Sequence, residues 1–138
     1  MSMLRNIFAV IAGIATFVVA IMLVQQLGHQ VYPPPTDINV DFGDPAQVRA
    51  YMATQPVGAL LFVGFAWMVG AFGGTLVATK TGTLKPLYFG VIIGGLVLAG
   101  AITNLFIIPH PVWFNIAGPA AILLATYAAI ALLDRSKQ

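Results

Sequence analysis

Four long apolar stretches are the feature that most constrains how this chain can fold. Residues 7–24, 57–78, 87–108 and 116–133 contain no Asp, Glu, Lys, Arg or His. Each stretch has about the length that a helix rising about 1.5 Å per residue needs to cross a hydrocarbon core of roughly 30 Å. Backbone amides cannot stay unpaired in lipid, so each stretch must be helical. The sequence therefore predicts an all-α integral membrane protein, folded as a four-transmembrane-helix bundle.

The four stretches and the segments between them fit a single domain, because a chain of 138 residues has room for only one. We expect one membrane domain over residues 1–138 with the following parts: spans at about 7–26, 57–78, 87–108 and 114–133, and an outer loop at 27–56. Only 7 % of the residues are charged and 59 % are apolar, a balance that a soluble domain would not tolerate. The net charge of +2 is too small for a nucleic-acid-binding surface, so we expect no nucleic acid partner.

The basic residues predict the orientation of the bundle. Five of the six fall on one side if the spans alternate in direction: Arg5, Lys80, Lys85, Arg135 and Lys137. Only Arg49 falls on the other side. Lys and Arg are enriched in cytoplasmic loops, so we expect both termini in the cytoplasm and the loop at 27–56 outside, as in a bacterial inner membrane protein.

Small residues recur at intervals of four in the second and third spans. Lipid tails are as apolar as Leu, so helices in a membrane associate by close packing of small residues. The residues with this spacing are Ala66, Gly70, Gly74, Ala78, Gly90 and Gly94. We interpret them as packing positions between the helices of one chain. The same pattern also forms dimers, and the two uses are compatible, so we also expect a homo-oligomer or a larger membrane complex.

The spans lack the residues that membrane chemistry usually needs. Ion-coupled transporters keep an ionisable side chain within the bilayer, and none occurs in the four stretches. No phosphate-binding loop, nucleophile elbow or His-Glu-x-x-His motif is present in the sequence either. This pattern favours a non-catalytic accessory, assembly or lipid-interacting protein whose partner is the lipid bilayer. A small carrier for apolar cargo is an alternative, since such cargo needs no buried charge.

Polar residues gather at the predicted outer ends of the spans. They lie at the end of the first span, near the end of the third and in the turn that follows: Gln25, Gln26, His29, Asn104, His110 and Asn115. All should lie at similar depth beneath the outer loop. The second functional hypothesis is therefore a metal- or ligand-binding site, with enzymatic activity as an option, built from His29, His110, Asn104 and the loop aspartates.

Two metals fit this hypothesis as alternatives to a site without a cofactor. His29 and His110 with Asp37 or Asp41 would give zinc two nitrogens and an oxygen. The spacing of Asp37, Asn39 and Asp41 matches the start of an EF-hand calcium loop. However, the sixth and twelfth positions are Phe and Val, where an EF-hand has Gly and Glu. A solvated acidic loop is the simpler interpretation.

The outer loop contains a helix start. Asp44 is a suitable N-cap, Pro45 suits the first helical position, and Gln47 lies three residues after Asp44. We expect a short helix that ends near Thr54 and lies flat at the membrane interface. Its apolar face would consist of Val48, Tyr51 and Met52.

Overall fold

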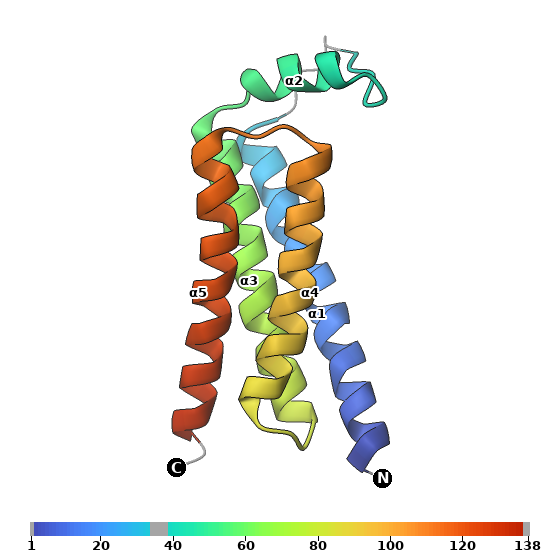
Figure 1. Cartoon of the computed structure of the whole chain (residues 1–138), viewed down its shortest axis with the longest axis vertical. Coiled ribbons are helices and arrows are strands. Elements are labelled where there is room, and N and C mark those ends of the chain that lie inside the picture. Colours follow the sequence, from blue (N-terminus) through green and yellow to red (C-terminus); the bar gives the residue numbers. More distant parts are fainter. Residues whose placement is uncertain (1, 34–38, 137–138) are drawn as a thin grey trace.

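Five helices make up the part of the chain that the computed structural model describes, residues 2–33 and 39–136. In chain order they are α1 (Ser2–Val31), α2 (Pro45–Ala53), α3 (Val57–Thr81), α4 (Pro86–Ile107) and α5 (Val112–Ser136). These residues include no strand. Four long helices run alternately up and down, and the short α2 lies across one end of them, which we call the α2 end (Figure 1). The predicted all-α bundle of four long helices with a short helix in the first loop is confirmed.

The four long helices are each long enough and apolar enough to cross a membrane. The first is longer than predicted, because the polar residues after the first apolar stretch continue the helix instead of ending it. Its last turn closes where the Tyr32 N–H donates to the Gly28 carbonyl at 2.8 Å. At 30 residues, α1 is about 45 Å long, which is more than the roughly 30 Å of a hydrocarbon core.

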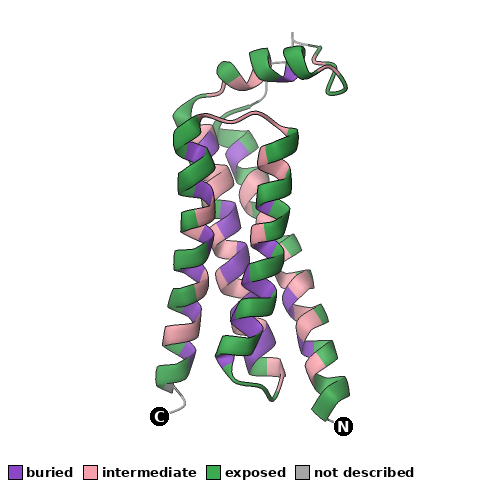
Figure 2. Cartoon of the chain, viewed as in Figure 1, coloured by how far each residue is buried: buried purple, intermediate pink, exposed green. Residues whose placement is uncertain are grey.

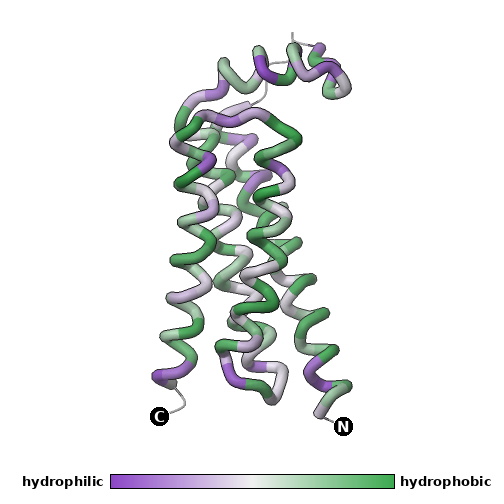
Figure 3. Tube along the Cα trace, in the orientation of Figure 1, coloured by the Kyte–Doolittle hydropathy of each residue, from purple (hydrophilic) through white to green (hydrophobic). Residues whose placement is uncertain are grey.

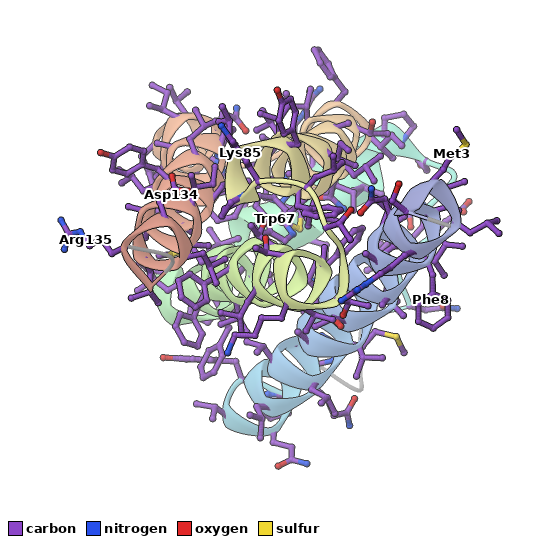
Figure 4. The ribbon with its side chains drawn as sticks, turned by 90° about the horizontal axis from the view of Figure 1, so that it is seen from below. Met3, Phe8, Trp67, Lys85, Asp134 and Arg135 are labelled. Atoms are coloured by element: carbon purple, nitrogen blue, oxygen red, sulfur yellow. The ribbon has the colours of Figure 1, made fainter. Side chains whose placement is uncertain are left out.

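Helix α3 lies at the centre of the bundle. It packs against α1, α4 and α5, whereas α1 and α5 make no contact with each other among the described residues. Seen along the bundle, α3 and its Trp67 lie between α1 on one side and α5 on the other (Figure 4). Figure 2 shows the buried residues concentrated on α3 and on the faces that the other helices turn toward it. Helix α1 is correspondingly the least buried of the four.

The surface of the four long helices is apolar around its whole circumference. Hydrophilic residues gather at the two ends and on α2, and the length of the bundle between them is mainly hydrophobic (Figure 3). Large exposed side chains there include Phe8, Leu61, Phe106 and Leu124. A soluble monomer rarely exposes so much contiguous apolar surface. The four helices are therefore suited to insertion in a membrane.

The six small residues singled out in the sequence are all buried. At the α1–α3 contact, a Cβ on Gly13 would lie 2.8 Å from the Gly74 carbonyl oxygen, and a Cβ on Gly74 would lie 2.9 Å from the Gly13 carbonyl oxygen. At the α4–α5 contact, a Cβ on Gly94 would lie 2.6 Å from the Thr126 side chain. These glycines therefore allow close approach between helices of the same chain, and self-association through the same residues stays a prediction.

Helix α2 begins as its sequence predicts. Asp44 is the N-cap, and its Oδ1 accepts a hydrogen bond from the Ala46 N–H at 3.0 Å. The Gln47 Oε1 accepts one from the Asp41 N–H at 2.9 Å, which ties the preceding loop to the first turn. The predicted apolar face is turned toward the bundle, since Val48 is buried and Met52 packs against the core around α3. Helix α2 thus closes one end of the bundle.

Candidate functional site

A pocket of about 220 Å³ lies at the α2 end of the bundle. Helices α1, α3 and α4 form its walls, and Tyr51 and Met52 of α2 contribute the roof with Gln55. His110 enters from the connection between α4 and α5. The pocket therefore joins α1, α2, α3, α4 and the connection between α4 and α5.

Four of the six predicted polar residues line this pocket: Gln25, His29, Asn104 and His110. Gln25, Asn104 and His110 are half-buried, and His29 is more exposed. Gln26 and Asn115 are exposed and lie outside the lining. Neighbouring residues on a helix point about 100° apart, so Gln26 points away from the pocket when Gln25 points into it. In the same way, Asn115 points outward because its neighbour Phe114 is buried.

Two of the predicted metal ligands, His29 and His110, line the same pocket, and Asp41 is not among its lining residues. Within residues 2–33 and 39–136, no group of three or more His, Asp or Glu side chains is placed to hold a metal ion. Asp41 is exposed, and its Oδ1 accepts a hydrogen bond from the Gly43 N–H at 2.9 Å. Asp37 lies outside the described residues. Zinc and calcium binding at this end therefore stay predictions.

His110 has a defined orientation. Its Nδ1 lies 2.7 Å from the Ile108 carbonyl oxygen, which can only accept, so Nδ1 carries the hydrogen. The Nε2 of the neutral ring is then a hydrogen-bond acceptor. The ring stacks on Phe114, with centroids 5.0 Å apart and planes inclined by 18°. Burial lowers the pKa of His110 below 6.5, although the hydrogen bond to Ile108 partly raises it. The ring is therefore neutral at pH 7 and offers an acceptor.

Tyr32 and Tyr51 also line the pocket, although nothing in the sequence indicated that they belong to one site. The Tyr32 ring packs edge-on against Phe62, with centroids 6.1 Å apart, and its hydroxyl lies against Gly58. The Tyr51 ring packs in the same way against Phe42, at 6.4 Å. The sequence predicted Tyr51 to lie on the apolar face of α2. Tyr32 has no local signal, because Gly58, which makes room for its ring, lies on α3 and is distant in the sequence.

An apolar groove begins next to the pocket. It runs between α3 and α5, has a volume of about 340 Å³, and shares Leu60 with the lining of the pocket. Farther along the same two helices, a second hollow of about 480 Å³ shares Phe65 and Met68 with the first. Phe114 links the two environments, because it lines the groove and stacks on His110. A pocket with several polar side chains thus lies beside an apolar groove.

Family models, curated proteins and solved structures give no match for this chain. A four-helix bundle hosts many functions, so the chemistry of the site, and not the fold, indicates the function.

The lowered pKa of His110 predicts that stability falls in mild acid. A group with a depressed pKa contributes stability that is fully present above its unfolded value of 6.5 and is lost as the pH falls through the folded value. We expect the melting temperature in detergent to fall from pH 8 to pH 5, and to fall less in His110→Asn, whose amide can still donate to Ile108. The two proteins differ only at residue 110, so the comparison isolates this ring. Equal pH dependence in the two proteins would contradict the assignment.

Proposed function

We propose that this protein is a non-catalytic membrane protein that binds an amphipathic molecule. The uncharged polar head would occupy the pocket at the α2 end, and the apolar tail would lie in the groove between α3 and α5. The observation that carries the proposal is that Gln25, His29, Asn104 and His110, from three separate segments, line one pocket beside an apolar groove.

The chemistry of the lining indicates the class of head group. Its described residues include amides, imidazoles and phenols, but no Asp, Glu, Lys or Arg. An ionic head would find no counter-ion there, and burying an unpaired charge is costly. Hydroxyl and carbonyl groups, in contrast, would find both donors and acceptors. The lining also contains no Ser, Thr or Cys among those residues, which favours binding over nucleophilic chemistry.

The size of the pocket limits the head group further. A volume of about 220 Å³ is below the roughly 300–1,000 Å³ of typical ligand pockets. It suits a small head such as the glycerol of an uncharged glycerolipid or the ring of a quinone. The rest of such a molecule is apolar and would need the adjoining groove.

We also propose an orientation for the bundle in the membrane. The start of α1, the end of α5 and the connection between α3 and α4 lie at one end of the bundle (Figure 1). Arg5, Lys85 and Arg135 belong to these segments, and Lys80 lies in the last turn of α3 at the same end. The positive-inside rule then supports cytoplasmic termini in a bacterial inner membrane, with the pocket facing outward.

The test uses the purified chain in detergent with two probes, dioctanoylglycerol and decylbenzoquinone. Gln25→Leu and Asn104→Leu remove hydrogen-bonding groups from the pocket, and each should weaken binding about tenfold, the effect of roughly 1.4 kcal/mol. The matched controls are Gln26→Leu and Asn115→Leu, which make the same changes outside the pocket and should bind like the original protein.

Native mass spectrometry and thermal shift would measure the affinities. Saturable binding of one probe that only the two pocket variants weaken supports the proposal, and the probe that binds identifies the head group. Equal binding by all four variants, or no binding of either probe, would overturn it.

A further inference from the structure

Residues 41–55, which include α2, form a unit that is held together by its own hydrogen bonds. At one end the Asp41 N–H donates to the Gln47 Oε1 at 2.9 Å. At the other end the Thr54 hydroxyl donates to the Tyr51 carbonyl at 2.7 Å. Within the part of the chain that the structure describes, no hydrogen bond joins this unit to the four long helices. The unit therefore keeps its hydrogen bonds wherever it lies relative to the bundle.

Packing between this unit and the bundle is sparse. Helix α2 lies across the end of the four long helices, and none of its Cα atoms comes within 8 Å of a Cα atom of another described helix (Figure 1). Met52 is the α2 side chain that packs against the core around α3. Val48 is also buried, but it belongs to neither core cluster of the bundle. Met52 therefore carries the packing of this unit on the core.

Met52 lies where two hollows meet. With Tyr51 and Gln55 of the same unit, it lines the pocket at the α2 end. Met52 and His110 also line another hollow, of about 270 Å³, between α2 and the connection from α4 to α5. Displacement of the Met52 side chain would therefore enlarge both hollows at the place where they share it.

The connection from this unit to α3 is short. Only Thr54, Gln55 and Pro56 separate the two helices. The φ of Pro56 is −68°, where its ring fixes it, so Pro56 adds little freedom. When one element moves as a rigid body, a few residues at its end absorb the change in backbone angles. Thr54 and Gln55 are the residues placed to do so here.

We propose that residues 41–55 are a rigid lid over the pocket, which turns about Thr54 and Gln55 and is held closed by Met52. Opening breaks none of the hydrogen bonds described above, and its main cost is the apolar burial of Met52. The opening admits the molecule that the pocket binds, so the use of the lid rests on the proposed function. The motion itself can be tested without a ligand.

The first measurement is the rate at which a cysteine in the pocket reacts with a bulky, water-soluble maleimide. The chain has no Cys, so Gln25→Cys places a single thiol in the pocket lining. Its reaction rate should follow the population of the open lid. We expect Met52→Ser to raise this rate roughly tenfold, because it removes most of the apolar contact that holds the lid. Gln26→Cys, which is exposed outside the pocket, should react at the same rate with and without Met52→Ser.

Phe42→Ser is the matched control for the change at Met52. Phe42 packs against Tyr51 inside the lid, with ring centroids 6.4 Å apart, so its removal leaves the contact with the core in place. It should leave the reaction rate of Gln25→Cys unchanged. Equal acceleration by Met52→Ser and Phe42→Ser, or acceleration by neither, would overturn the proposal.

A second measurement follows the lid itself. Spin labels on Ala50→Cys and Leu123→Cys report the distance between the exposed faces of α2 and α5, and labels on Leu61→Cys and Leu123→Cys report the distance between α3 and α5. Electron paramagnetic resonance should give a broader distribution of distances for the first pair than for the second. Met52→Ser should broaden or shift the first distribution alone. Two distributions of equal width that Met52→Ser leaves unchanged would contradict a moving lid.

These measurements separate the lid from the proposed function. If a probe binds the pocket while neither measurement detects motion, the lid is overturned and the proposed function stands. If both measurements detect motion and neither probe binds, the lid is supported and the proposed function is overturned.

Discussion

Gly74→Leu is expected to lower the free energy of unfolding by about 3 kcal/mol, at the upper end of what overpacking usually costs. Even a Cβ at this position would lie 2.9 Å from the Gly13 carbonyl oxygen and 2.9 Å from the Ile93 side chain. The first of these is backbone and cannot move without moving the whole of α1. The substitution must therefore push α1 and α3 apart along their contact. Titration with a denaturing detergent, followed by circular dichroism, measures the loss.

Gly100→Leu is the matched control, because a Cβ on Gly100 would meet nothing within 4 Å. Its effect should stay within about 0.5 kcal/mol. Gly13→Leu should cost about as much as Gly74→Leu, since it disrupts the same contact from the other side. The double variant should cost much less than the sum, because the helices are already separated. Additive losses would show that the two glycines do not share one contact.

Phe114→Ala is expected to cost about 3–5 kcal/mol, as for large-to-small changes in well-packed cores. Phe114 is only 2 % exposed and contacts three rings, with centroids 5.4 Å away for Trp67, 5.0 Å for His110 and 5.6 Å for Trp113. Its loss also enlarges the α3–α5 groove, which Phe114 lines. His110 then gains solvent, so its pKa should rise toward the ordinary value of 6.5.

Phe106→Ala is the control for the aromatic deletion. Phe106 is 86 % exposed on α4, so its removal creates no cavity and should change stability by no more than about 0.5 kcal/mol. NMR titration of the His110 ring in both variants checks the second part of the prediction. A large loss in both proteins, or an unchanged His110 titration in Phe114→Ala, would contradict this role for Phe114.

The elements of this fold could be predicted from the sequence because each has a local cause. The uncharged stretches require helices in lipid, and the Asp44-Pro45 pair starts α2 wherever the loop lies. The central position of α3 could not be predicted in this way. Each long helix is apolar on all sides, so its sequence contains no polar face to indicate which side points inward. The order of packing depends on shape, as in the fit of Gly13 against Gly74.

The candidate site, too, could be predicted from the sequence only in part. The end of the bundle where polar side chains gather could be inferred from their positions along the spans. Which of them share the pocket depended on helix rotation, which separates Gln25 from Gln26 and which the sequence does not specify. The contribution of Tyr32 depended on a long-range contact with Gly58 on the facing helix. Such contacts leave no periodic pattern in the chain.

The central position of α3 has a consequence for the order of assembly during synthesis. The most extensive contact in the bundle joins α1 and α3, and both lie within the first 81 residues. Helices that insert one after another can therefore form this pair before α4 and α5 have left the ribosome. The second pair then docks on a surface of α3 that is already held in place. The N-terminal half of the chain acts as the template on which the C-terminal half completes the fold.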